Sequence, residues 1–176
     1  GFDIASGGEL RSALDAGTAP ERISFAGPGK RDDELEAAIS AGVAINLESE
    51  GEANRALAIA DGLGVRPRLA IRVNPDFELK GSGMRMGGGA RPFGIDADRA
   101  GALARQVIAS GAEWCGWHIF AGSQALGAQA IIDAQGQQLR GTALRLTGKP
   151  AEARAIMTRA LADATSIRWR SRRSAR

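Results

Sequence analysis

The first 120 residues repeat one pattern, and this repetition limits the possible folds more than any other feature of the chain. Short apolar runs alternate with stretches of roughly ten residues whose apolar side chains have helical spacing. Strands are predicted at 2–6, 22–26, 43–47, 68–74 and 113–120, and helices at about 9–16, from 32 or 33 to 42, at about 51–61 and from 96 or 98 to about 110. No two-residue hairpin turn joins neighbouring strands, so the pattern predicts a parallel sheet.

Two parallel architectures fit five such units, a (β/α)₈ barrel and a doubly wound sheet. No GxGxxG motif follows the first strand, which argues against a dinucleotide-binding sheet. A complete barrel typically needs ~250 residues, whereas this chain has 176. We therefore expect an α/β fold in which residues 1–124 form a partial TIM-type barrel of about five parallel βα units. Residues 125–176, rich in Ala and Arg, are expected to form a divergent tail, partly helical and then disordered.

The positive charge of the chain is concentrated near its end. Residues 151–176 hold seven arginines and two acidic residues, a balance of +5, whereas the whole chain carries +3. The first 150 residues therefore have a balance of −2, which predicts no nucleic-acid partner for the folded part. The alternative is a basic arm around Trp169 that contacts nucleic acid or an anionic membrane.

Hydropathy gives no sign of a membrane protein. No apolar run approaches the ~20 residues that cross a bilayer, and the first residues lack the features of a signal peptide. We expect a cytoplasmic protein without a membrane partner. The single Cys115 and the single His118 limit any metal site, and none is expected. Because Cys115 falls within an apolar strand, it is predicted to be a buried structural thiol.

The last predicted strand runs directly into Ala121-Gly122-Ser123. Such a turn offers backbone N–H groups and a hydroxyl at one point in space, which is a common way to hold a phosphate. His118 and Phe120 lie two residues apart and therefore share one face of the strand. The stretch predicts the floor of a small anionic-ligand site, and the alternative is a core strand that ends in a tight turn.

Polar residues also follow or end the other predicted strands. In a parallel barrel the carboxyl ends of the strands hold the ligand. The residues expected there are Asp3, Ser6, 27–30, Glu48, Ser49, Arg72, Asn74, His118, Phe120, Gly122 and Ser123. This mixed set suits a charged ligand that carries a ring and a phosphate. The alternative for each residue alone is a helix cap or a turn partner.

Several motifs together resemble a known family. The stretches GFDIASGGELRSAL, FAGPGKRDDEL, INLES, IRVNP, GGGARPFGI and GWHIFAGSQ occur in this order and spacing. They resemble the N-terminal, alanine-racemase-like barrel of the fold-type III decarboxylases that use pyridoxal 5'-phosphate (PLP), the ornithine/diaminopimelate/arginine decarboxylase group. HIFAGSQ is most similar to the exosortase-associated pyridoxal-dependent decarboxylases. The resemblance covers about 1–124 and implies PLP as cofactor, carboxy-lyase activity on a small amino-acid substrate, and a homodimeric parent protein.

The resemblance implies cofactor-binding roles for three residues on the earlier units. Asp3 resembles the acid near the family's Schiff-base lysine. Glu9 resembles a helix glutamate that supports a neighbour of the cofactor ring, although it could instead simply favour the helix dipole. Arg72 resembles the arginine close to the phenolic oxygen of the cofactor.

Three more cofactor-binding residues are implied at the last strand. Phe120 takes the position where many relatives have a histidine that stacks on the pyridine ring; a phenyl ring can stack there but cannot donate a proton. Ser123 resembles the phosphate-binding serine, and His118 matches the first histidine of the diaminopimelate-type motif.

The departures from the family pattern predict an inactive fragment. The Schiff-base lysine of the family lies on a strand that would precede Gly1, so no catalytic residue is assigned to this chain. The family's Gly-rich phosphate turn, its glutamate at the pyridine nitrogen and its second domain are also missing, and the pattern stops after Gln135. The alternative function is a non-catalytic PLP-binding barrel module of the cofactor-homeostasis type.

Overall fold

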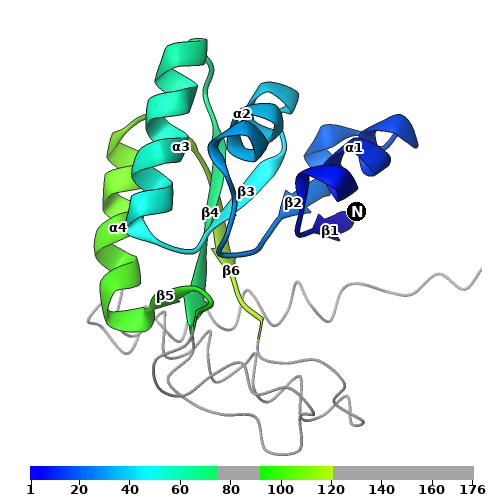
Figure 1. Cartoon of the computed structure of the whole chain (residues 1–176). Coiled ribbons are helices and arrows are strands. Elements are labelled where there is room, and N and C mark those ends of the chain that lie inside the picture. Colours follow the sequence, from blue (N-terminus) through cyan, green and yellow to red (C-terminus); the bar gives the residue numbers. More distant parts are fainter. Residues whose placement is uncertain (75–91, 121–176) are drawn as a thin grey trace, which may run out of the picture. The chain divides into compact units, whose positions relative to one another are not determined.

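The computed structural model describes residues 1–74 and 92–120 of the chain. Within these ranges, four α-helices and six strands alternate along the chain, except that the next described element after the fourth strand is another strand (Figure 1). The elements are β1 (Phe2–Ile4), α1 (Gly7–Asp15), the 3₁₀ turn η1 (Pro20–Arg22), β2 (Ile23–Phe25), α2 (Asp32–Ala41), β3 (Ala44–Leu47), α3 (Glu50–Leu63), β4 (Arg68–Asn74), β5 (Ile95–Asp96), α4 (Ala97–Ala109) and β6 (Glu113–His118). Each predicted strand and helix is present.

All strand pairs in the described part of the chain are parallel. The order is β1-β2-β3-β4, and β4 then pairs with both β6 and the short β5. Asp3 is the register partner of Ser24, and Arg72 is the register partner of His118. The sequence pattern did not reveal β5, because two residues are too few to show a periodicity. The parallel α/β architecture is confirmed.

One face of the sheet packs against the helices, which lie one after another along that side from α1 to α4 (Figure 1). Alternate strand residues point to this face, and they are among the most buried of the described side chains. They include Ile4, Ile23, Phe25, Ile45, Leu47, Leu69, Ile71 and Val73. From α3 the buried apolar residues are alanines, Ala53, Ala56 and Ala60. Small side chains let this helix lie close to the strands, so the core is a thin layer between helices and sheet.

Capping residues mark the ends of several helices. Ser6 and Ser49 are N-caps whose hydroxyl oxygens accept hydrogen bonds from the N–H groups of Glu9 (3.3 Å) and Glu52 (3.1 Å). Gly42 ends α2 in the left-handed conformation at φ 78°, as predicted.

The prediction for the start of α2 was wrong by one or two residues. The N-cap is Arg31, and the predicted capping residues Asp32 and Asp33 lie in the first turn, where their charges still favour the helix dipole. Glu34, not an aspartate, accepts the hydrogen bond of the Arg31 N–H, at 3.0 Å.

The opposite face of the sheet is polar and concave. It carries Asp3, Ser24, Asn46, Arg72 and His118, each on a different strand. Strands β1 and β6 are separated by three others, and in a flat sheet with strands ~4.8 Å apart they would lie about 19 Å from each other. Yet the Asp3 carboxylate lies 3.9 Å from the His118 ring. The sheet must therefore curl around its polar face, as the wall of a barrel does, and the predicted partial TIM-type barrel is confirmed.

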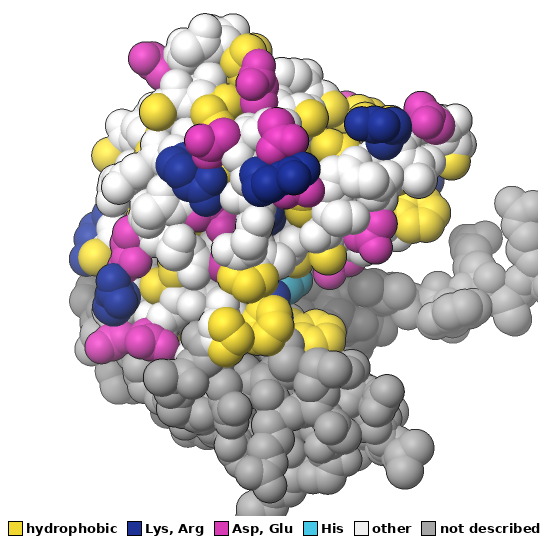
Figure 2. Space-filling view, viewed as in Figure 1, with side chains coloured by type: hydrophobic (Ala, Val, Ile, Leu, Met, Phe, Trp, Pro, Cys, Tyr) yellow, Lys and Arg dark blue, Asp and Glu magenta, His cyan; other side chains and the backbone are white. Residues whose placement is uncertain are grey.

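The outer surface over the helices carries both signs of charge. Figure 2 shows basic and acidic side chains interspersed on the face in view. Three of the ion pairs there are exposed, Arg31–Asp33, Arg55–Asp32 and Arg99–Glu50. Among the described helices, none is long and apolar enough to span a bilayer. The predicted tail, 125–176, lies outside the described residues, as does most of the Gly-rich segment at 80–94.

Candidate functional site

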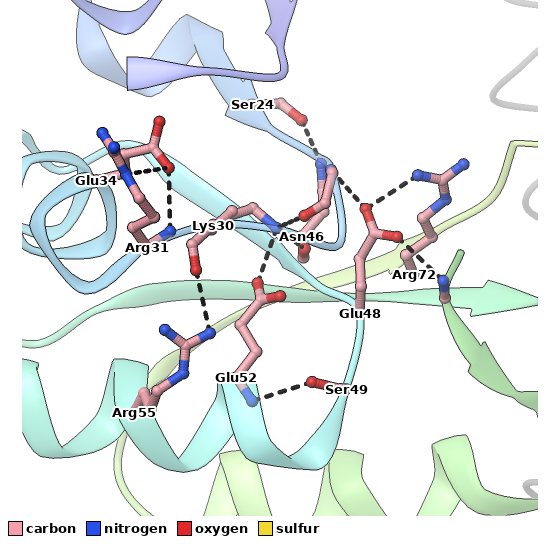
Figure 3. Close-up of polar contacts among 12 residues, drawn as sticks. Ser24, Lys30, Arg31, Glu34, Asn46, Glu48, Ser49, Glu52, Arg55 and Arg72 are labelled. Atoms are coloured by element: carbon pink, nitrogen blue, oxygen red, sulfur yellow. Dashed lines mark hydrogen bonds and ion pairs between the residues drawn. The ribbon is translucent and has the colours of Figure 1, made fainter. Parts of the chain in front are cut away.

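The carboxylate of Glu48 joins three segments at the C-terminal ends of the strands (Figure 3). Glu48 directly follows β3. Its Oε1 accepts hydrogen bonds from the Gly27 N–H (2.5 Å) and from Arg72 (2.9 Å), and its Oε2 accepts one from the Gly94 N–H (3.0 Å). The Glu48 side chain is 1% exposed and that of Arg72 is 8% exposed. Burying these two charges is tolerated because each is paired and hydrogen-bonded.

The guanidinium of Arg72 lies between two aromatic rings. Its central carbon is 4.9 Å from the centroid of the Phe93 ring and 5.6 Å from that of Phe120. Both distances lie within the range of a cation–π contact. Phe120, the residue predicted to stack on a cofactor, therefore also contacts the predicted cofactor-binding arginine.

A row of hydrogen bonds crosses the polar face from β3 to β1. The side-chain amide of Asn46 donates to the Ser24 hydroxyl (2.7 Å), and that hydroxyl donates to the Asp3 carboxylate (2.9 Å). The second oxygen of Asp3 lies 3.9 Å from Nε2 of His118. The row holds Asp3 in one orientation although its side chain is 57% exposed.

The imidazole of His118 sits in a mixed environment. Burial lowers its pKa from the ordinary 6.5, the Asp3 carboxylate opposes this, and the Arg72 guanidinium lowers the pKa further. The ring is therefore neutral at pH 7. Its Nδ1 is buried and has no hydrogen-bond partner among the described residues. A neutral imidazole with an unpaired nitrogen is suited to accept or donate one hydrogen bond to a bound ligand.

All three hydrogen-bond donors of Lys30 are engaged beside this site (Figure 3). Its ammonium donates to the carbonyl of Gly27 (2.7 Å), the carbonyl of Asn46 (2.8 Å) and the carboxylate of Glu52 (2.7 Å). An ammonium has three donors, so none remains for another partner. Burial raises the pKa of Glu52, and the nearby Lys30 charge opposes that shift. No local pattern indicated this ion pair, because it joins two residues that are 22 positions apart.

Four of the six predicted site residues come together. Asp3, Arg72, His118 and Phe120 surround the C-terminal end of the polar face, through the contacts given above. Glu9 makes local contacts, because its carboxylate accepts the Ala5 N–H at 2.6 Å and its own N–H donates to the Ser6 hydroxyl. Its cofactor role stays a prediction. Ser123 lies outside the described residues.

Sequence reasoning missed the central positions of Glu48 and Phe93. Glu48 was placed at a strand end but was not counted among the binding residues, and Phe93 was not singled out. The signal that was available for Glu48 is an acidic residue directly after an apolar strand, at the end of the sheet where Arg72 was expected. Phe93 offered no comparable signal.

The prediction for Cys115 was wrong. The thiol is exposed rather than buried. The register with β4 shifts between Leu69 and Ala70, which pair with Trp114 and Gly116. Cys115 is therefore the extra residue of a β-bulge and is turned out of the alternation that would have buried it. Burial of part of its surface still raises the pKa of the thiol, which argues against a reactive thiolate.

Neither the surface cavity nor the acidic residues of the described part of the chain form a better site. A surface cavity lies near the start of β4 and is lined by Leu57, Asp61, Val65, Arg66 and Ser110, among others. It lies at the opposite end of the strands from the polar set, and parallel barrels hold ligands at the C-terminal end. In residues 1–74 and 92–120, no three His, Cys, Asp or Glu residues are grouped so as to hold a metal ion.

Comparison with known proteins shows the family of the chain. The model of the pyridoxal-dependent decarboxylase, pyridoxal binding domain, matches residues 1–144. The chain belongs to this decarboxylase family. PLP is the cofactor of the family, and its members are carboxy-lyases.

Relatives of the chain include known decarboxylases. Over 136 residues the chain is 36% identical to the L-glutamyl-[BtrI acyl-carrier protein] decarboxylase of Niallia circulans, which covers 76% of this chain and 32% of that protein. Over 156 residues it is 36% identical to the diaminopimelate decarboxylase of Pseudomonas aeruginosa, which covers 85% of this chain and 36% of the relative. The chain thus spans about a third of the length of these relatives.

A solved structure with the same fold is the diaminopimelate decarboxylase of Helicobacter pylori complexed with L-lysine. The match has a TM-score of 0.74 and 32% sequence identity, and it covers 84% of this chain and 39% of that one.

The described residues fit part of a PLP site. The unpaired Nδ1 of His118, the guanidinium of Arg72 and the Phe120 ring form a donor set and a stacking surface suited to an anionic ring. The imine-forming lysine is not among them, because Lys30 has all three donors engaged. The other lysines, Lys80 and Lys149, lie outside the described residues.

Proposed function

We propose that this chain forms part of the cofactor-binding wall of a PLP-dependent amino-acid decarboxylase of the diaminopimelate or ornithine type. The observation that carries the proposal is the convergence of Asp3, Arg72, His118 and Phe120 at the C-terminal end of one polar sheet face. In a parallel barrel that end is where ligands bind, and the family of the chain uses PLP.

Each residue has a task that its chemistry allows. When bound, PLP supplies an electron sink for bond cleavage in an amino acid. Arg72 would offer positive charge to the phenolic oxygen, Phe120 a stacking surface, and Ser123 a hydroxyl to the phosphate. The neutral His118 would accept or donate a hydrogen bond at Nδ1, and Asp3 would place a negative charge beside that ring.

We propose that the 176-residue chain alone has no decarboxylase activity. The lysine that this chemistry needs is not offered by Lys30, which is held in a buried ion pair. We also propose a small amino acid as substrate and a homodimeric, cytoplasmic parent protein. The proposal includes no nucleic-acid or membrane partner.

Reduction with borohydride tests whether a lysine carries the cofactor. The chain is incubated with PLP, reduced and mapped by mass spectrometry. We expect no stoichiometric pyridoxyl-lysine. A single fully modified lysine would contradict the proposed inactivity and would identify the residue responsible.

Equilibrium dialysis with PLP tests the site itself. We expect Arg72→Gln to abolish measurable binding and Arg68→Gln to leave it unchanged. The two arginines lie on the same strand, but Arg68 pairs with the exposed Glu113 at the opposite end. Equal binding by the wild type and Arg72→Gln would reject the proposed site.

A further inference from the structure

Glu48 contacts Arg72 but is not among the residues that were assigned to bind the cofactor. We propose that Glu48 is a positioning residue, which sets the place of the Arg72 guanidinium relative to His118 by holding Gly27, Arg72 and Gly94 at the same time. The inference rests on the proposed function only for its biological meaning. The positioning of Arg72 by Glu48 depends only on contacts within this chain.

The Glu48 carboxylate reaches three separate segments of the chain. It accepts hydrogen bonds from the turn after β2, from the side chain on β4 and from the segment that precedes β5, at 2.5, 2.9 and 3.0 Å. A carboxylate only accepts hydrogen bonds, so all three donors meet acceptor lone pairs. A glutamine of the same shape has one acceptor oxygen and would turn its NH₂ group toward at least one of these N–H donors.

Glu48 also holds the segment that carries one of the two rings against Arg72. Phe93 precedes Gly94, whose N–H donates to Glu48. Gly94 has φ 72°, and a Cβ there would lie 2.9 Å from the Asn74 nitrogen and 3.0 Å from the Arg72 carbonyl oxygen. The backbone at 94 is therefore pressed against β4. Glu48 thus fixes one edge of the guanidinium and the segment that carries a stacking ring.

His118 lies where it can report the position of Arg72. It is the register partner of Arg72 on the neighbouring strand, so a movement of the guanidinium changes the charge beside its ring. The charged groups that act on His118 are Asp3 from β1, Arg72 from β4, Glu48 from the end of β3 and Lys30 from the turn before α2. His118 is also the only histidine of the chain, so its imidazole signals in an NMR spectrum need no assignment.

The experiment is a double-mutant cycle read by NMR titration of His118 in the 176-residue chain without PLP. Arg72→Gln removes a cation that lowers the pKa of His118, so the pKa should rise in the otherwise wild-type chain. If Glu48 positions Arg72, the same substitution made in Glu48→Gln should raise the pKa by less than half as much, because the guanidinium has already left its place. An equal rise in both backgrounds would overturn the proposal.

Two controls separate positioning from folding. Glu52→Gln removes an equally buried acid that does not contact Arg72, and Glu113→Gln removes an acid at the far end of β6. In both, the effect of Arg72→Gln should remain as in the wild type.

A conservative variant keeps the proposal testable if Glu48→Gln does not fold. Glu48→Asp retains the charge but is one methylene shorter, and we expect an intermediate effect of Arg72→Gln in that background. Unfolding of both Glu48 variants, while Glu52→Gln folds, would assign Glu48 to stability alone and overturn the proposal. Because no PLP is used, a failed dialysis experiment leaves this outcome unaffected.

Discussion

Two buried ion pairs of this chain, Lys30–Glu52 and Arg72–Glu48, lie close together in the fold and differ in how many hydrogen-bond donors they leave available. Lys30–Glu52 is 1% exposed on both sides, and the three donors of Lys30 are all bonded. Arg72–Glu48 is almost as buried, but only one of the five guanidinium donors of Arg72 is engaged by a described residue. Burial of charge is thus common to both pairs, and the unused donors distinguish the candidate site from a structural contact.

The two pairs meet at Gly27. Glu48 accepts the hydrogen bond of its N–H, and Lys30 donates to its carbonyl. The Lys30 pair therefore stabilises the turn on which the Glu48 cluster depends. The comparison predicts that changes at Lys30 act on stability alone, whereas changes at Arg72 act on ligand binding as well as on stability.

The largest effect is expected for Lys30→Met. The substitution leaves Glu52 buried without its partner, which should lower the free energy of unfolding by about 3–5 kcal/mol. Urea denaturation measures this. The exposed Arg99→Gln, which breaks the pair with Glu50, is the control and should cost at most about 1 kcal/mol. If both variants lost the same small amount, the Lys30 pair would not be the structural contact described here.

A smaller loss is expected for Gly27→Ala. Gly27 has φ 109°, which a residue with a Cβ rarely adopts, so the strain should cost about 1–3 kcal/mol. Gly29→Ala, in the same turn, meets nothing within 4 Å and has no positive φ, so it should fold as the wild type does. Thermal unfolding of the two variants compares them directly, and equal stabilities would show that the turn adapts.

Phe120→Leu should have a still smaller effect on stability. It keeps an apolar side chain but removes the ring near the Arg72 guanidinium, a contact worth about 0.5–1 kcal/mol. The control is Phe2→Leu, at an exposed position on β1. PLP dialysis should reveal a clear loss of affinity for Phe120→Leu and none for Phe2→Leu. An unchanged affinity would mean that Phe120 supports Arg72 only and does not touch the cofactor.

The smallest expected effect is a loss of stability at acidic pH that depends on His118. The folded-state pKa of His118 is lowered below 6.5, so the unfolded chain binds a proton before the folded one does. This group therefore contributes stability above pH 6.5 that is lost as the pH falls through the folded-state pKa. His118→Gln should lose less stability than the wild type across that window, as measured by urea denaturation at several pH values. Parallel curves for the two proteins would contradict the lowered pKa.

The sequence by itself determined the order and type of the elements. The strand at 68–74 was predicted with its observed bounds, and Gly42 ends α2 as expected. These features depend on apolar spacing and on backbone preferences within a few residues, which the sequence displays directly. The sequence also predicted that Asp3, Arg72 and His118 lie at the C-terminal ends of the strands, because parallel strands present these ends on one side of the sheet.

Only the tertiary structure decided which of these residues touch. Glu48 reaches Gly27 and Gly94, which are 21 and 46 positions away, and Asp3 reaches His118 only because the sheet curls. The exposure of Cys115 follows from a shift in strand register that no local pattern encodes. Register and curvature are set by the packing of the whole sheet against its helices, so contacts across the polar face are decided by the fold as a whole.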